Sequence, residues 1–177
     1  APFFMLTANL FSQLASDPSQ VAYMVNVMSA LLSAGCILFL FWSITHLTRR
    51  LLCGNSHTIK TGQMVTIIGA GLVGALAYTF SDTFWYSAVE SEVYAYSSFF
   101  TAVVFWFILK WEEEAGSVHS DRWLILIAYL MGLSVGVHLL NLLCIPAIVL
   151  IYYFKKNPNA GWKGTIMALA VSAALVA

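Results

Sequence analysis

The sequence predicts an all-α fold, a polytopic bundle of membrane-spanning helices. This prediction rests on composition, on long apolar runs and on a one-sided distribution of basic residues. The 177-residue chain is 60% hydrophobic and 9% charged, with a mean hydropathy of +0.83, whereas a soluble domain carries about a quarter charged residues. The formal net charge is zero, so no broad basic face is offered to nucleic acid, and we expect no nucleic-acid partner.

The apolar runs predict one transmembrane domain over residues 1–177. A short interfacial helix is expected at 3–15, followed by spans at about 18–48, 64–81, 93–110, 122–137, 139–154 and 163–177, the last cut off by the end of the chain. The first span has a recognisable start, "SDPSQ". There Asp17 is placed as N-cap, Pro18 takes the first helical position, and Gln20 is placed to close a capping box.

The apolar stretch from Trp123 to Phe154 is too long for one span. As a single helix it would extend roughly 48 Å at 1.5 Å per residue, and the hydrocarbon core of a bilayer is only about 30 Å thick. Two short spans that turn around "VGVHLLN", at 135–141, fit the bilayer better.

Charge placement supports this hairpin. With two spans, all lysines and arginines fall on one side, namely Arg49, Arg50, Lys60, Lys110, Arg122, Lys155, Lys156 and Lys163. The positive-inside rule makes that side cytoplasmic. The other side holds Asp17, Asp82, Glu90, Glu92 and His138. We therefore expect the acidic loop at 82–92 and the turn at 136–141 on the outer face.

The N-terminal segment "PFFMLTANLFSQL" places its large apolar residues, Phe3, Leu6, Leu10 and Leu14, on one helical stripe. This pattern favours a helix that lies in the outer membrane interface. The alternative is the end of a buried helix.

Gly69, Gly71 and Gly74 have the G-x-G-x-x-G spacing of a dinucleotide-binding loop, and Glu90 follows at about the right distance for a ribose contact. Their context is a lipid-length apolar run rather than a soluble βαβ unit. Small residues four apart, such as Gly71 with Ala75 or Ala70 with Gly74, also allow close packing of membrane helices. We expect helix packing here and no nucleotide cofactor.

The cysteines and histidines predict neither a disulfide nor a metal site. Cys36 and Cys144 fall in apolar runs, and Cys53 has only His57 nearby, four residues on, with no further ligands close in sequence. His46 and His119 share the basic side without ligand spacing. No cofactor is evident from the residues, and the pattern leaves a dependence on a divalent metal open.

The polar residues of the outer side are the candidate site. The segment "SDTFWYSAVESEVYAY" carries Asp82, Glu90 and Glu92 among aromatic residues, and the next outer turn carries His138 and Asn141. A carboxylate at the mouth of an apolar helix is costly unless it is solvated or has a partner. Together these groups suggest a site for a polar head group. A solvated loop, interfacial aromatic anchors and a structural histidine cap are the alternatives, and packing best explains Asn26, Ser29 and Ser33 in the first span.

Several stretches resemble a known family. These are "FSDTFWYSAVESEVYAYSSFF", "KWE", "DRWLILIAYLMGLSVGVHLLNLLCIPAI", "APFFML" and "NVMSALLSAGCILFLFWSITHL". They are similar to the bacterial membrane family catalogued as domain of unknown function 2723, which is common in Bacteroidetes. That family resembles the protein O-mannosyltransferases and other GT-C glycosyltransferases, and a vertebrate relative acts as an O-mannosyltransferase.

The resemblance implies part of an integral-membrane GT-C glycosyltransferase in the bacterial inner membrane. Such an enzyme takes a sugar from a polyprenyl-phosphate carrier and passes it to an acceptor on the periplasmic face, and the resemblance implies that the acceptor is protein serine or threonine. Its partners would be the bilayer, the lipid-linked donor and a periplasmic acceptor protein. A carboxylate base would activate the acceptor hydroxyl.

The chain departs from the family pattern at its start. In the family an acidic motif precedes the stretch that corresponds to "APFFML", and this chain begins just after that position. We therefore expect the catalytic acid to lie upstream of Ala1, the chain alone to be inactive, and Glu90, Glu92, His138, Asn141 and Asp82 to be supporting, substrate-binding residues. A transporter core and a non-catalytic scaffold are the rival functions.

Overall fold

A computed structural model describes residues 1–54, 56 and 58–176 of the chain. Within these residues the fold is helical and contains no strand, so the predicted all-α membrane helix bundle is confirmed. The helices are α1 (Pro2–Ser12), the 3₁₀ helix η1 (Pro18–Gln20), α2 (Val21–Cys53), α3 (Thr61–Thr79), α4 (Asp82–Val89), α5 (Val93–Glu114), α6 (Asp121–Val135), the 3₁₀ helix η2 (Leu139–Cys144), α7 (Ile145–Lys156) and α8 (Trp162–Val176).

In the described part of the chain, four helical segments are long and apolar enough to cross a membrane. They are Pro18–Cys53, Thr61–Thr79, Val93–Glu114 and Leu139–Lys156, where the first and last each join a 3₁₀ turn to an α-helix. A span needs about 20 mainly apolar residues. The chain is therefore a multi-pass membrane protein.

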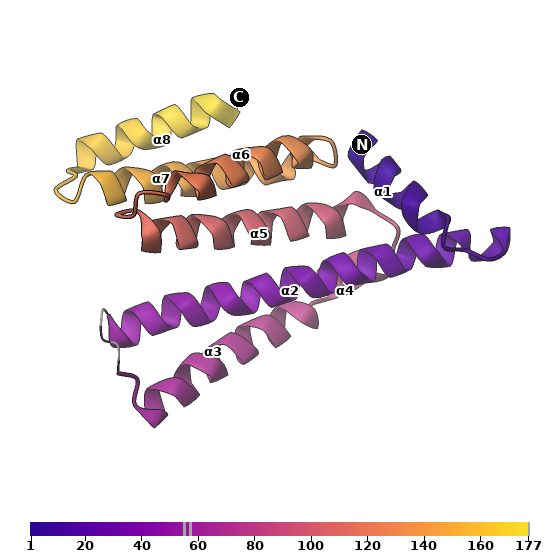
Figure 1. The fold of residues 1–177 in the computed structure, drawn as a ribbon, viewed down its shortest axis with the longest axis horizontal. Helices are drawn as coiled ribbons and strands as arrows, with labels where there is room; N and C mark the ends of the chain where they lie inside the picture. Colours follow the sequence, from indigo (N-terminus) through magenta and orange to yellow (C-terminus); the bar gives the residue numbers. More distant parts are fainter. Residues whose placement is uncertain (55, 57, 177) are drawn as a thin grey trace.

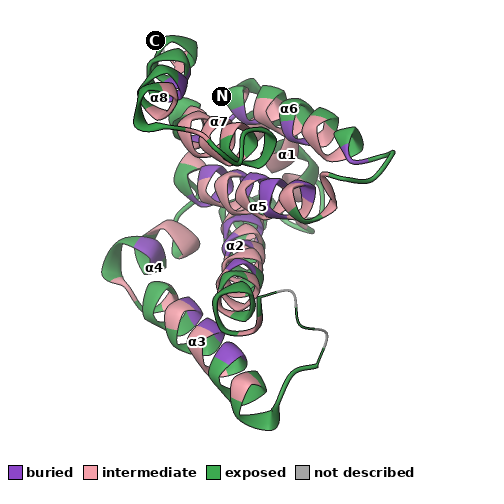
Figure 2. Cartoon of the chain, turned by 90° about the vertical axis from the view of Figure 1, so that its left-hand side faces the viewer, coloured by how far each residue is buried: buried purple, intermediate pink, exposed green. Residues whose placement is uncertain are grey.

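Helix α2 lies at the centre of the arrangement (Figure 1). Helices α3 and α4 lie on one side of it and α5 on the other, while α6 and α7 cover α5 and α8 packs on α7. The view along the bundle shows that α3 and α4 lean away from the helices beyond α5 (Figure 2). Their outward faces carry exposed apolar side chains, among them Val65, Leu72, Val73 and Trp85, as helices facing lipid do.

Helix α5 carries the two buried clusters. Near its last turns Val104, Ile108 and Trp111 pack with Ile127 of α6. Near its first turns Tyr96 and Phe100 pack with Val137, just after α6. Because lipid is as apolar as these side chains, close packing rather than removal from water holds membrane helices together.

The three glycines of α3 that have the G-x-G-x-x-G spacing are not equivalent. A Cβ atom added to Gly71 would lie 2.5 Å from Thr45 Cγ2, and one added to Gly74 would lie 2.5 Å from Ile44 Cδ1, both on α2. A Cβ added to Gly69 would meet nothing within 4 Å. Gly71 and Gly74 thus allow α3 to approach α2, as the packing interpretation expects, whereas Gly69 takes no part in the contact.

The start of the first span follows the expected cap in part. Asp17 accepts a hydrogen bond from the Ser19 amide at 2.8 Å, and Pro18 opens the helix. In the part of the chain that the structure describes, the Gln20 side chain forms no reciprocal bond to Asp17. The first turn is wound as a 3₁₀ helix, and Gln20 ends it instead of standing at the third position of an α-helix.

The apolar stripe expected at the N-terminus is divided between two faces. The Phe3 ring packs on Tyr96 at 5.8 Å between centroids, and the Phe3 amide donates to the Gly136 carbonyl at 2.9 Å. Leu6 and Leu10 are exposed on the other side, and Leu14 lies beyond the end of α1. The bundle-facing row is Phe3, Thr7 and Phe11, four residues apart, because the i, i+4 spacing follows one face of a helix.

The long apolar stretch forms the two helices α6 and α7. The end of α6 and the start of α7 are joined by 136–144, where the amides of Gly136 and His138 donate to carbonyls of the last turn of α6. At their other ends Arg122 pairs with Glu114, and Lys155 lies 3.9 Å from Glu112, both glutamates belonging to the last turn of α5. The chain therefore reverses between α6 and α7.

Candidate functional site at the acidic end

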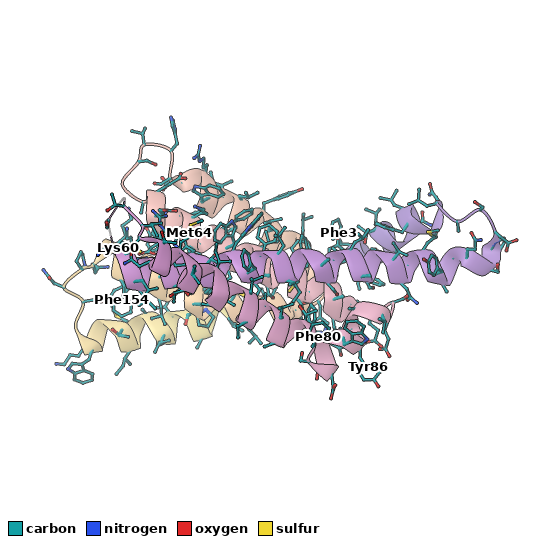
Figure 3. All side chains as sticks on the ribbon, turned by 90° about the horizontal axis from the view of Figure 1, so that it is seen from below. Phe3, Lys60, Met64, Phe80, Tyr86 and Phe154 are labelled. Carbon is teal, nitrogen blue, oxygen red and sulfur yellow. The ribbon has the colours of Figure 1, made fainter. Side chains whose placement is uncertain are left out.

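The bundle has two ends of opposite character. Viewed from below, Lys60 and Phe154 lie at one end, and Phe80 and Tyr86 lie toward the other (Figure 3). We call the first the basic end, comprising residues 46–54, 56, 58–63, 110–123 and 154–163. We call the second the acidic end, comprising residues 1–26, 80–94 and 136–144. Glu90, Glu92, Asp82 and His138 all belong to the acidic end.

The turn between α4 and α5 presents the two glutamates. The Glu90 amide closes α4 by donating to the Tyr86 carbonyl at 3.1 Å, and the backbone of Glu90 and Glu92 is extended. Glu92 occupies the N-cap position of α5, where a negative charge is favoured by the helix dipole. Both residues are exposed. Their carboxylates are therefore available to a ligand or to water.

Asn26 of α2 fastens this turn to the bundle. Ser91, between the two glutamates, donates a hydrogen bond to Asn26 Oδ1. The sequence prediction assigned Asn26 to helix packing, and 65 residues separate the partners. No local spacing signals such a contact. Its only sequence sign is an amide in an apolar span, which is rare without a polar partner.

His138 lies beside the first turn of α5. Its Nδ1 accepts the Leu140 amide at 3.1 Å, which makes it the N-cap of η2. The ring also packs against Tyr94 with centroids 5.6 Å apart, and Tyr94 is two residues beyond Glu92. Because Nδ1 accepts, the neutral ring carries its proton on Nε2, which is then a donor. The structure thus brings His138 to the glutamate turn while also giving it the structural capping role.

Asn141 does not line a cavity with the carboxylates. Its side chain is fully buried, donates to Ser134 Oγ at 2.9 Å and accepts from Thr101 Oγ1 at 3.3 Å. These bonds join η2 to α6 and α5. A buried amide must find partners, and helix neighbours supply them. Asn141 therefore fixes the turn that carries His138.

Asp82 lies apart from His138, at the start of α4. It lines a hollow of about 350 Å³ with Phe80, Trp85 and Tyr86. The Phe80 and Trp85 rings are stacked with centroids 6.1 Å apart. The five candidate residues are therefore divided among the glutamate turn with His138, a buried helix contact and this aromatic hollow.

An apolar hollow of about 170 Å³ lies between α1, α2 and α5 at the same end. Its lining is Thr7, Phe11, Met28, Leu31, Leu32, Tyr96 and Phe99. Tyr96 is one turn beyond Glu92, so the hollow begins near the glutamate turn. The sequence prediction did not identify this feature, because its lining joins α1 and α2 to α5, which is distant from them in the chain.

Over 1–54, 56 and 58–176, no three histidine, cysteine, aspartate or glutamate side chains lie close enough to hold a metal ion. Of the Cys53–His57 pair, His57 lies outside the described residues. What the acidic end offers chemically is carboxylates that can accept a proton, a ring N–H donor and an adjoining apolar hollow.

Comparison with protein-family models identifies a family for this chain. The family model described as the protein O-mannosyl-transferase TMEM260 N-terminal domain matches residues 1–161. No curated protein and no solved structure was found to match the chain. The predicted likeness to protein O-mannosyltransferases is thereby confirmed. The bacterial origin and the name domain of unknown function 2723 stay predictions.

Proposed function

The chain belongs to the protein O-mannosyl-transferase TMEM260 N-terminal domain family, and we propose that it is part of an integral-membrane GT-C glycosyltransferase that modifies protein. The single observation that carries this proposal is the family match over residues 1–161. The four helical segments of spanning length agree with an enzyme embedded in the bilayer.

The proposed donor is a sugar linked to a polyprenyl phosphate. The apolar hollow between α1, α2 and α5 supports this choice, because it would accept part of an isoprenoid chain beside the polar turn. A nucleotide sugar would have no use for such a hollow. The candidate dinucleotide loop is accounted for by packing of Gly71 and Gly74 against α2.

The proposed reaction face is the acidic end, on the outer, periplasmic side of a bacterial inner membrane. The support is the collection of basic residues at the opposite end, since basic loops stay in the cytoplasm. The acceptor is a serine or threonine of a protein on that outer side. Its hydroxyl oxygen forms a bond to the anomeric carbon, the bond from that carbon to the phosphate oxygen breaks, and polyprenyl phosphate leaves.

The hydroxyl proton passes to a carboxylate base, which we expect upstream of Ala1. In this chain Glu90, Glu92 and His138 contact the head group, because they are the polar side chains gathered at the α4–α5 turn. Asp82 and its aromatic neighbours contact the sugar or the acceptor from their own hollow. Asn141 and Asn26 position the two turns.

A transfer assay with the full-length enzyme tests the donor and the acceptor together. Purified enzyme in detergent is given a serine- and threonine-rich peptide and either polyprenyl-phosphate mannose or a nucleotide-linked mannose. The proposal predicts mannosylated peptide only with the lipid-linked donor. Transfer from the nucleotide sugar in the absence of lipid carrier would contradict it.

A further inference from the structure

The basic end contains a hollow that the proposed reaction does not use. It has a volume of about 320 Å³ and lies between the ends of α2, α5 and α7. Its lining is His46, Arg49, Arg50, Gly54, Glu112, Glu113 and Lys155. The lining is thus almost entirely ionisable, in contrast to the apolar and aromatic hollows of the acidic end.

The two carboxylates of this hollow are already occupied. Glu112, whose side chain is 12% exposed, is paired with Arg50 and has Lys155 Nζ at 3.9 Å. Glu113 accepts from Lys110 Nζ at 2.8 Å. Four cationic side chains, those three and Arg49, therefore surround two carboxylates, and the hollow carries excess positive charge.

Of the four cationic side chains around this hollow, Arg49 has no carboxylate partner among the described residues. Among residues 1–54, 56 and 58–176, no acidic side chain lies within ion-pair distance of its guanidinium, although it lines the hollow beside Arg50. A guanidinium presents up to five N–H donors, which match the oxygens of a phosphate. The ion pair with Glu112 accounts for Arg50, whereas Lys155 Nζ, at 3.9 Å from Glu112 Oε1, is beyond hydrogen-bond distance. Arg49 and Lys155 therefore both keep unused donors.

The surroundings place the hollow at the depth of lipid head groups. It lies at the ends of three helices, α2, α5 and α7, each of which belongs to a segment of spanning length. At the same end cations lie over aromatic rings in four pairs, Lys110 with Trp106, Arg122 with Trp123, Lys156 with Tyr152 and Lys163 with Trp162. Aromatic rings with long basic side chains mark the membrane–water interface.

We propose that this hollow binds the phosphate group of an anionic phospholipid, with Arg49 and Lys155 as the principal donors. Basic pockets between membrane helices on the cytoplasmic side suit anionic head groups, which are abundant in that leaflet. The lipid lies at the end opposite the proposed reaction face and is distinct from the sugar donor. The proposal does not depend on the proposed glycosyl transfer.

Binding is tested by thermal unfolding of the detergent-purified protein with added lipid. Micelles doped with phosphatidylglycerol should raise the midpoint, whereas phosphatidylcholine at the same concentration should not. Inorganic phosphate is included at matched concentration. An equal shift with inorganic phosphate would make the ligand a soluble phosphate and overturn the lipid assignment, and equal shifts with both lipids would overturn the site.

The matched variants are Arg49→Gln and Lys155→Gln, with Lys163→Gln as the control at the same end but outside the hollow. Each basic residue near a membrane surface contributes about 1 kcal/mol of attraction to anionic lipid, so each variant of the hollow should weaken phosphatidylglycerol binding about fivefold. Arg49→Gln breaks no ion pair and should leave the midpoint without lipid unchanged. If Lys163→Gln weakened phosphatidylglycerol binding as much as Arg49→Gln does, the attraction would be a diffuse property of the surface. That result would refute the hollow as the binding site.

Discussion

The glutamates at the two ends of α5 are in opposite situations. At the basic end Glu112, Glu113 and Glu114 are each held by a cation. At the acidic end Glu90 and Glu92 precede the same helix, and within the described part of the chain neither has a cation at ion-pair distance. Charges with partners are explained by structure alone. Charges without partners near a membrane need water or a ligand.

This difference suggests that the two ends of the bundle have different roles. The basic end anchors the helices through ion pairs and cation–π contacts. At the acidic end, by contrast, exposed carboxylates, a histidine and two hollows are available to a ligand. Substitutions of the ion-paired residues at the basic end should then reduce stability, and substitutions of the exposed acids at the acidic end should reduce activity.

The largest effect is expected from the exposed polar groups of the acidic end. Glu90→Gln, Glu92→Gln or His138→Asn in the full-length enzyme should lower sugar transfer by about a hundredfold, the lower range for losing one polar contact that is made in the transition state. Stability should change by less than about 0.5 kcal/mol because the acids are exposed, and asparagine keeps an N-cap acceptor. Transfer rates and thermal midpoints are measured side by side. Wild-type rates in all three variants would eliminate the site.

Asn141→Ala should show the reverse pattern, although the residue belongs to the acidic end. It removes the bonds to Ser134 and Thr101 from a buried position, which should reduce stability by about 1–3 kcal/mol. Chemical unfolding in mixed micelles measures this. Exposed Asn9→Ala on α1 is the control. If the Asn141→Ala variant kept full stability but lost sugar transfer, Asn141 would act on the substrate and not in the helix contact.

Glu112→Gln should have a smaller effect on stability. It leaves Arg50 and Lys155 without their carboxylate, and since Arg50 is half exposed we expect a loss of about 1–2 kcal/mol, below the range for a fully buried pair. Glu113→Gln, on the exposed side, should cost at most about 0.5 kcal/mol. Identical unfolding curves for both variants would show that the basic end is not held by ion pairs.

The smallest effect concerns Asp17, the acidic-end carboxylate that does have a partner. The Ser19 amide, which donates to the Asp17 carboxylate, holds the pKa of that carboxyl below its usual value. The stabilisation of the helix start is present above the unfolded pKa, about 3.9, and is lost as pH falls through the lower folded pKa. In the wild-type protein, hydrogen exchange of the η1 amides should accelerate only when the pH falls below about 4. The comparison is with the exchange rates of the same amides in the Asp17→Asn variant. A protection that is unchanged to pH 2 would contradict the cap.

Sequence reasoning could reach the helices because the composition and the lengths of the apolar runs are set by the bilayer. Residues Asp17, Pro18, Gly71 and Gly74 also act locally or on a neighbouring helix, so their roles could be predicted. The grouping of the polar residues could not. Asn26 meets Ser91 and Asn141 meets Thr101 across separate helices, and helix rotation, which decides such contacts, leaves little trace in a uniformly apolar span.

The same reason explains the divided stripe of α1 and the missed basic hollow. Phe3, Thr7 and Phe11 face the bundle because α1 docks on α2 and α5, and an apolar helix offers several rows that could serve. The hollow at Arg49 depends on which cation each glutamate takes, and that is set by the approach of α2, α5 and α7.

Sidedness is the central claim, because the assignment of the acidic end to the reaction and of the basic end to anchoring requires opposite compartments. The most direct measurement is labelling of single cysteines in living cells with a membrane-impermeant maleimide. Ser91→Cys and Ser117→Cys, both at exposed positions, are made in a chain whose Cys36, Cys53 and Cys144 are replaced by serine. We predict that position 91 is labelled in intact cells and position 117 only after permeabilisation. Labelling of position 117 in intact cells, or of both positions from the same side, would contradict the account.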